Sequence, residues 1–163
     1  MVARLDCNLR LFAGALEREL GHQVALMPGA GAAGGMGAGC VALMGGRLKR
    51  GVQAILDTVN FDEKLDGADL VITGEGRLDG QSLGGKVLSG VLERTRPRNI
   101  PVVAIVGDVD DSAYRAYDAG VSAIFSINRL AIPFERAMQR SKEDYRRTLE
   151  DVMRLIRAAE QMR

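Results

Sequence analysis

Three charged side chains stand at alternate positions in the segment GEGRLD, namely Glu75, Arg77 and Asp79. The segment follows residues 69–73, an apolar run that predicts a short buried strand. Carboxylates placed there could bind Mg²⁺ or accept a proton, and the guanidinium could clamp a carboxylate or a phosphate. We therefore predict that these three residues are catalytic and that Glu75 and Asp79 are candidate Mg²⁺ ligands. An Arg–carboxylate pair that only stabilises a turn is the alternative.

Glycine is the second unusual feature. It accounts for 20 of the 163 residues, and sixteen of these lie between Gly29 and Gly90. They concentrate in two segments, PGAGAAGGMGAG (28–39) and TGEGRLDGQSLGGK (73–86). Such density gives access to positive φ and lets backbone N–H groups approach a ligand closely. A low-complexity linker is disfavoured because both segments adjoin strong signals for secondary structure.

The first of these segments matches the GxGxxG pattern of dinucleotide sites at Gly29, Gly31 and Gly34. The candidate strand before it, residues 23–27, is short, and Asp57, at about the expected acidic position, lies inside a helical pattern. A loop and helix N-terminus whose N–H groups hold an anion is the simpler interpretation.

The second segment matches a Walker A loop, GxxxxGK, from Gly80 to Lys86. Val87 stands where Ser or Thr would bind Mg²⁺, and residues 74–79 separate the loop from its strand, so a true P-loop is disfavoured. Backbone donors, the charge of Lys86 and a helix dipole still suit phosphate. The predicted substrate- and phosphate-binding residues are Gly29, Gly31, Gly34, Gly35, Gly37, Gly74, Gly76, Ser82 and Lys86.

Helices and strands alternate along the chain. Helices are predicted over 5–20, 51–59, 86–96, 112–119 and from 133 to the end, and strands over 69–73, 101–106 and 122–127. Continuous apolar strands between helices predict the α/β class, with a parallel Rossmann-like sheet flanked by helices. Because ligands bind beyond the carboxyl ends of such strands, loops 74–85 and 107–111 are the expected location of the site.

Several residues have a simpler structural interpretation. Asp108, Asp110 and Asp111 are predicted to cap the helix that begins near Ser112. Met27, Met36, Met44, Met138 and Met153 are predicted to pack in the core. The last helix carries an apolar stripe, which is formed by Tyr145, Leu149, Val152, Ile156 and Ala159.

Composition limits the partners. The formal net charge of +1 provides no field that favours nucleic acid or an anionic membrane. No apolar run approaches the roughly 20 residues of a membrane span, and the N-terminus has no signal-peptide pattern. We expect a cytoplasmic protein that binds a small molecule, binds neither nucleic acid nor membrane, and has a homodimer through the stripe of the last helix as one candidate assembly.

Five segments, taken in chain order, resemble the motifs of one protein family. They are PGAGAAGGMGAG, GGRLKRGVQAIL, ADLVITGEGRLDGQSLGGK, PVVAIVGD and AGVSAIFSI. Together they resemble the glycerate kinase family, bacterial enzymes that phosphorylate D-glycerate with ATP. The resemblance runs from residues 5–9 to the last helix. It matches only the C-terminal part of the family members, which are much longer.

The resemblance implies that residues 1–163 are a single α/β unit equivalent to that C-terminal part, with GEGRLD in the active cleft. It implies ATP and Mg²⁺ as cofactors and D-glycerate as substrate. It also implies an N-terminal half, without counterpart here, as a further candidate partner. Because that half is absent, a non-catalytic ligand-binding or dimerisation module is the alternative. The further hypothesis of an NAD-dependent oxidoreductase rests on the match to GxGxxG alone.

Overall fold

Residues 1–21, 23–80 and 87–162 are described by a computed structural model. The chain divides into two units, Met1–Gly51 and Val52–Arg163. The described residues of the first unit form helices and turns, so the α/β character predicted for the chain belongs to the second unit. One unit over residues 1–163 stays a prediction.

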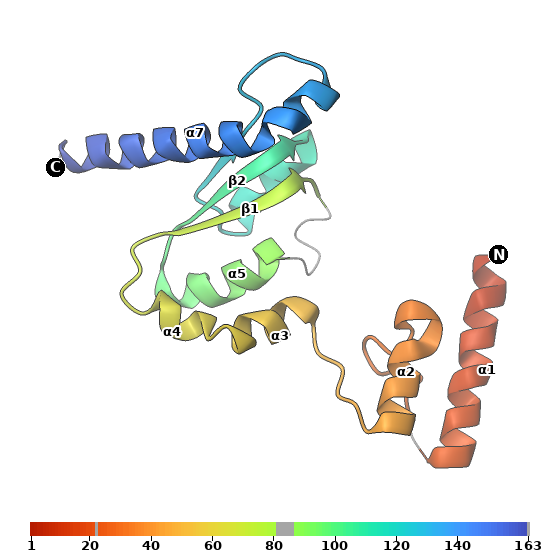
Figure 1. Ribbon diagram of the computed structural model, residues 1–163. Coiled ribbons are helices and arrows are strands. Elements are labelled where there is room, and N and C mark those ends of the chain that lie inside the picture. The colour runs from red at the N-terminus through yellow and green to blue at the C-terminus, as the bar shows by residue number, and fades with distance from the viewer. Residues whose placement is uncertain (22, 81–86, 163) are drawn as a thin grey trace. The chain divides into compact units, whose positions relative to one another are not determined.

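The first unit contains the helices α1 (Val2–Leu20) and α2 (Ala32–Met44) (Figure 1). The predicted helix over 5–20 is confirmed, and Gly21 ends it in the left-handed conformation with φ 70°. The candidate strand at 23–27 does not form, because Met27 N–H donates to the Val24 carbonyl and the backbone turns there. The core of this unit consists of Ala13, Leu16, Val24, Ala30, Ala38 and Ala42.

The glycine-rich segment shapes the beginning of α2. Ala33, Gly34 and Gly35 have left-handed φ values of 51°, 68° and 93°, so regular helix begins only after them. A Cβ at Gly37 would lie 2.3 Å from the Gly29 carbonyl oxygen. Glycine at position 37 is therefore what allows this turn of the helix to pack against the preceding loop.

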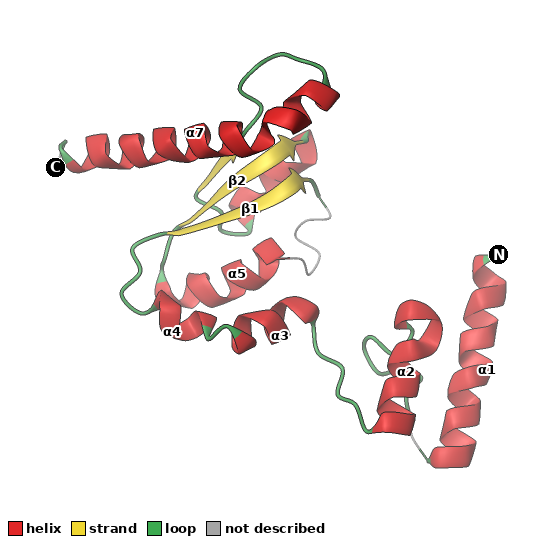
Figure 2. Cartoon of the chain, in the orientation of Figure 1, coloured by secondary structure: helices red, strands yellow, loops and turns green. Residues whose placement is uncertain are grey.

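The second unit is built on a parallel sheet. Its strands β1 (Val71–Leu78), β2 (Val102–Val109) and β3 (Ala123–Ser126) lie in the order β1-β2-β3. The helices of this unit are α3 (Gly51–Thr58), α4 (Phe61–Leu65), α5 (Val87–Thr95), α6 (Arg115–Asp118) and α7 (Phe134–Glu160), with short 3-10 helices η1 (Arg96–Arg98) and η2 (Asp111–Tyr114). Helices cover both faces of the sheet, which confirms the predicted fold class (Figure 2).

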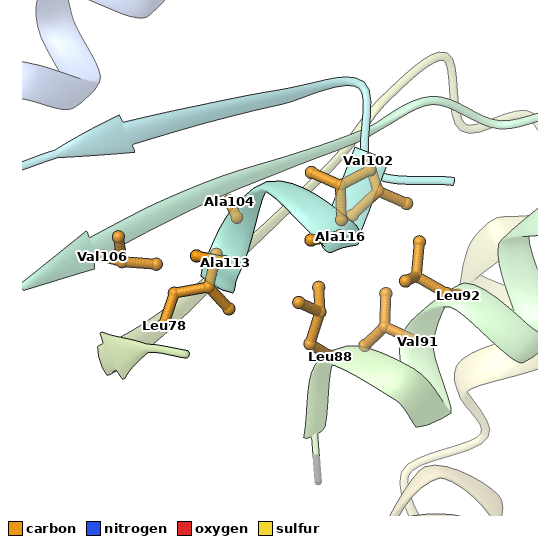
Figure 3. Close-up of a cluster of buried hydrophobic side chains, with 10 residues drawn as sticks. Leu78, Leu88, Val91, Leu92, Val102, Ala104, Val106, Ala113 and Ala116 are labelled. Atoms are coloured by element: carbon orange, nitrogen blue, oxygen red, sulfur yellow. The ribbon is translucent and has the colours of Figure 1, made fainter. Parts of the chain in front are cut away.

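Alternation along β2 separates two cores. Val102, Ala104 and Val106 point to one face, where they pack with α5, α6 and Leu78 (Figure 3). Val103 and Ile105 point to the other face, where α7 covers them with Leu149, Val152 and Ile156. The apolar stripe predicted on the last helix therefore packs on the sheet of its own unit. A homodimer stays a prediction.

Two strands are longer than predicted. The expected strand 69–73 continues to Leu78, so most of GEGRLD is strand rather than loop, and the strand expected over 101–106 continues to Val109. The cause is close backbone pairing, since a Cβ at Gly107 would lie only 2.2 Å from the Gly76 carbonyl oxygen. The helix expected over 112–119 is present as η2 followed by α6.

Candidate functional site

The carboxyl ends of β1 and β2 bring charged side chains together. In the parallel register Glu75 is paired with Val106 and Arg77 with Asp108. Glu75 and Arg77 were predicted from GEGRLD, whereas Asp108 reaches the site because the second strand runs on beside the first. This edge of the sheet is where α/β proteins bind ligands.

Arg77 joins the ends of the two strands. Its Nε lies 3.8 Å from Asp108 Oδ2 and its Nη2 3.6 Å from Asp110 Oδ2, and the Arg77 side chain is 60% exposed. At that exposure the two ion pairs contribute little stability. They do hold the guanidinium beside the carboxylates at the strand ends.

Asp110 and Ser112 form a second link at the same end of the sheet. The Ser112 N–H donates to Asp110 Oδ1 over 2.7 Å, the Ser112 hydroxyl donates to the same oxygen, and the Gly80 N–H donates to Ser112 Oγ over 2.8 Å. The hydrogen bonds from Ser112, aided by Arg77, hold the pKa of Asp110 below its usual value. Asp110 is thus the residue that caps η2, as predicted.

A pocket of about 690 Å³ opens between these strand ends and the first turns of α7, which lie near the arrowheads of β1 and β2 in Figure 1. Gly74, Gly76 and Gly107 line its floor at the strand ends. Glu75 and Asp108 also line it, but Glu75 is paired with Val106, so its side chain points to the face of the sheet that packs against α5 and α6 rather than toward α7. Its remaining lining residues are Ile105, Val106, Ile127, Asn128, Leu130, Ile132, Phe134, Ala137, Met138, Ser141 and Tyr145.

The predicted site residues are therefore only partly brought together. Glu75, Gly74 and Gly76 line the pocket, and Arg77 pairs with its Asp108. Asp79 is half-buried and makes contacts of its own, but it is not among the residues that line the pocket. Ser82 and Lys86 lie outside the described residues.

The predicted Mg²⁺ site can be tested on the donors present. Within residues 1–21, 23–80 and 87–162 no three His, Cys, Asp or Glu side chains converge as a metal cluster. Mg²⁺ usually binds one or two carboxylates and keeps waters and substrate phosphates as its other ligands. Glu75 and Asp108 both line the pocket, and Glu75 forms no ion pair with any described residue. Binding of Mg²⁺ by Glu75 and Asp79 stays a prediction, and Asp108 is a further carboxylate at the same strand ends.

The glycine-rich segment at 28–39 belongs to the first unit. Part of its backbone is already hydrogen-bonded: the N–H groups of Ala30, Gly35 and Ala38 donate to the carbonyls of residues 27, 31 and 30. These donors are used inside the unit. The predicted anion binding by Gly29, Gly31, Gly34, Gly35 and Gly37 stays a prediction, and of its donors the Gly35 N–H is taken by the Gly31 carbonyl.

Sequence reasoning missed the wall that α7 contributes. All five methionines predicted as core are exposed. Met138, at 59% exposed, lines the pocket, and so does Asp108, which was predicted as a cap. A signal was present, because the stripe on α7 continues toward its N-terminus through Ser141, Met138 and Phe134 at the same helical spacing. That extension should have marked a second surface on the helix.

Comparison with known proteins gives a consistent result. The model of the glycerate kinase family matches residues 1–157. A glycerate kinase of Bacillus cereus is 42% identical over 152 residues, which cover 93% of this chain and 40% of that protein. The glycerate 2-kinase of Escherichia coli is 40% identical over 127 residues, which cover 78% of this chain and 33% of that protein.

A solved structure agrees with these relatives. The crystal structure assigned to glycerate kinase 2 from Salmonella typhimurium LT2 has a TM-score of 0.75 and 36% identity, and it covers 100% of this chain and 41% of that one. The chain thus spans 33% to 41% of the length of these three relatives. None of the helices in the described residues has the length and apolar character needed to cross a bilayer.

Proposed function

The chain belongs to the glycerate kinase family, and from that premise we propose that it supplies the C-terminal part of an enzyme that transfers a phosphoryl group from ATP to a hydroxyl of D-glycerate. The observation that carries the proposal is the pocket at the carboxyl ends of β1 and β2, which Glu75 of GEGRLD and Asp108 both line. A cytoplasmic location and an N-terminal partner segment belong to the same proposal.

Phosphoryl transfer depends on positioning and on neutralising charge more than on covalent chemistry. Glu75 and Asp108 would hold Mg²⁺, with Asp79 as the remaining candidate ligand, and the ion would supply charge neutralisation for the phosphates. Glu75 is also the candidate base for the hydroxyl proton of the substrate. Arg77 keeps Asp108 in position through the ion pair between their side chains.

Arg77 has a second candidate role, as a clamp for a carboxylate or phosphate. Its exposure supports this, because more than half of the side chain can be reached from solvent. Its two carboxylate partners compete with that role, because a clamp must be released from them before it can bind an anion. In this proposal Arg77 is therefore a positioning residue first.

The test is a coupled assay that measures ADP release from ATP by the 163-residue chain, with and without D-glycerate. We expect release that depends on glycerate and a fall in kcat of more than about tenfold in Glu75→Gln, which corresponds to over ~1.4 kcal/mol in the barrier. Glu160→Gln is the matched control, because it removes the same charge from an exposed position at the far end of α7.

The outcomes separate the two candidate functions. Equal turnover in the two variants would refute the role of Glu75. Absence of glycerate-dependent ADP release from the chain would contradict its activity and favour the non-catalytic ligand-binding or dimerisation module.

A further inference from the structure

The residues that line the pocket between β1, β2 and α7 differ in polarity from one side of the pocket to the other. Glu75, Asp108 and three glycines line it from the strands, whereas α7 and the segment before it contribute large apolar side chains. Phe134 is 73% exposed and Met138 59% exposed. Exposed aromatic and apolar side chains gathered around a concave site are typical of ligand pockets.

The volume of the pocket distinguishes between the two substrates of the proposed reaction, glycerate and ATP. The pocket measures about 690 Å³. At the volume that liquid water occupies per non-hydrogen atom, D-glycerate would fill roughly 200 Å³ and adenosine roughly 570 Å³. Glycerate alone would leave most of the pocket to water against apolar walls, whereas a nucleoside is of matching size.

The chemical character of the lining also favours the nucleoside over glycerate as the ligand of this pocket. Glycerate is a small polar anion, and the apolar side chains of Phe134 and Met138 on the wall of α7 offer it no partner. A purine has two apolar faces, which can stack on the ring of Phe134 and contact the thioether of Met138. Ser141 and Asn128 place a hydroxyl and an amide in the same lining, and these can bond to the polar edge of a base.

From these observations we infer that the wall formed by Phe134, Met138, Ser141 and Tyr145 seats the adenosine moiety of ATP, and that glycerate binds elsewhere. The inference rests on the proposed kinase function for its choice of nucleotide. The base lies against α7, and the sugar and phosphates extend toward the glycine backbone of residues 74, 76 and 107 at the strand ends.

The probe for this site is adenosine, which lacks phosphates and therefore reports on the nucleoside pocket alone. Its affinity for the full chain is measured by ligand-detected NMR or calorimetry. Phe134→Ala should weaken binding at least about fivefold, since base stacking on an aromatic side chain contributes ~1–3 kcal/mol. Met138→Glu should weaken it at least about tenfold, because the new carboxylate stands where the purine must exclude water.

Met153→Glu is the matched control, because Met153 is an exposed methionine on the same helix that does not line the pocket. It should change the affinity less than about twofold, and circular dichroism must show that all three variants remain folded. Equal adenosine affinity in Met138→Glu and Met153→Glu overturns the inference. So does displacement of adenosine by D-glycerate, because that would place both ligands on one wall.

Failure of this inference and failure of the proposed function give different results. Adenosine binding that depends on Met138, in a chain without glycerate-dependent ADP release, supports the nucleoside site and contradicts catalysis by the chain. Glycerate-dependent ADP release with adenosine affinity unchanged in both pocket variants supports the activity and overturns the site.

Discussion

Replacing Gly107 with alanine tests how the floor of the pocket is built. A Cβ at position 107 would lie 2.2 Å from the Gly76 carbonyl oxygen on the neighbouring strand. Ordinary carbon–oxygen contacts are longer by about 1 Å, so the variant must push β1 and β2 apart at this point. Both contact atoms belong to backbone or lie next to it, so no side-chain rotation can relieve the clash.

The magnitude follows from the hydrogen bonds that the separation stretches. Opening the pair by about 1 Å takes the nearest one or two bonds beyond their usual 2.7–3.2 Å range, and each contributes roughly 0.5–1.5 kcal/mol net. Removing a glycine returns roughly 0.4–1 kcal/mol through the unfolded state. We therefore expect Gly107→Ala to lower the free energy of unfolding by about 1–2 kcal/mol.

Gly76→Ala is the matched control on the facing strand. Its Cβ would meet no atom within 4 Å, and its φ is not positive, so this variant should be as stable as the parent or slightly more stable. The chain has no Trp, so urea unfolding is followed by circular dichroism. If both alanine variants unfold at the same urea concentration, the argument from close strand approach is wrong.

Two further predictions concern single residues. Ala33 has a left-handed backbone with φ 51°, so Ala33→Gly should raise the free energy of unfolding by about 1 kcal/mol, whereas Ala32→Gly beside it should lower it or leave it unchanged; urea titration distinguishes the two signs. Hydrogen bonds from Ser112, and then Arg77, lower the pKa of Asp110, so its carboxylate stabilises the fold above the ordinary Asp pKa near 4, and this contribution is lost as pH falls through the lowered folded-state value. The difference in unfolding free energy between the parent and Asp110→Asn should therefore shrink on acidification from neutral pH to about pH 2; a constant difference would contradict the assignment.

Local patterns were enough to predict α7 and the presence of the three strands, but not α4, and the candidate strand at 23–27 was wrong. The steps of four and three residues on α7 and the apolar runs at β1, β2 and β3 come from side chains that face a core, and the structure confirms each element. The length of β1 was not predictable in this way. Its last residues are glycine and charged residues, which disfavour strands by themselves, and the backbone of β2 holds them in the sheet.

The site residues could likewise be predicted where local sequence determines them, and could not where contacts distant in the sequence do. Glu75 and Arg77 were predicted as site residues because charged side chains directly after a buried strand usually bind a ligand or form an ion pair. Asp108 was assigned to capping because its position beside Arg77 depends on a register between strands that are distant in the sequence. Met138 was assigned to the core because a helical stripe does not say where the covered sheet ends and an open pocket begins.

Helix α7 packs on the sheet with one part of its length and lines the pocket with another. Occupancy of the pocket and attachment of the helix are therefore thermodynamically linked. A ligand at about a hundredfold excess over its Kd adds ~2.7 kcal/mol to the free energy of any opening that destroys the site. Amide hydrogens of β2 beneath Val152 and Ile156 should then exchange more slowly when the far end of the same helix is in contact with a ligand, so the helix reports binding along its whole length.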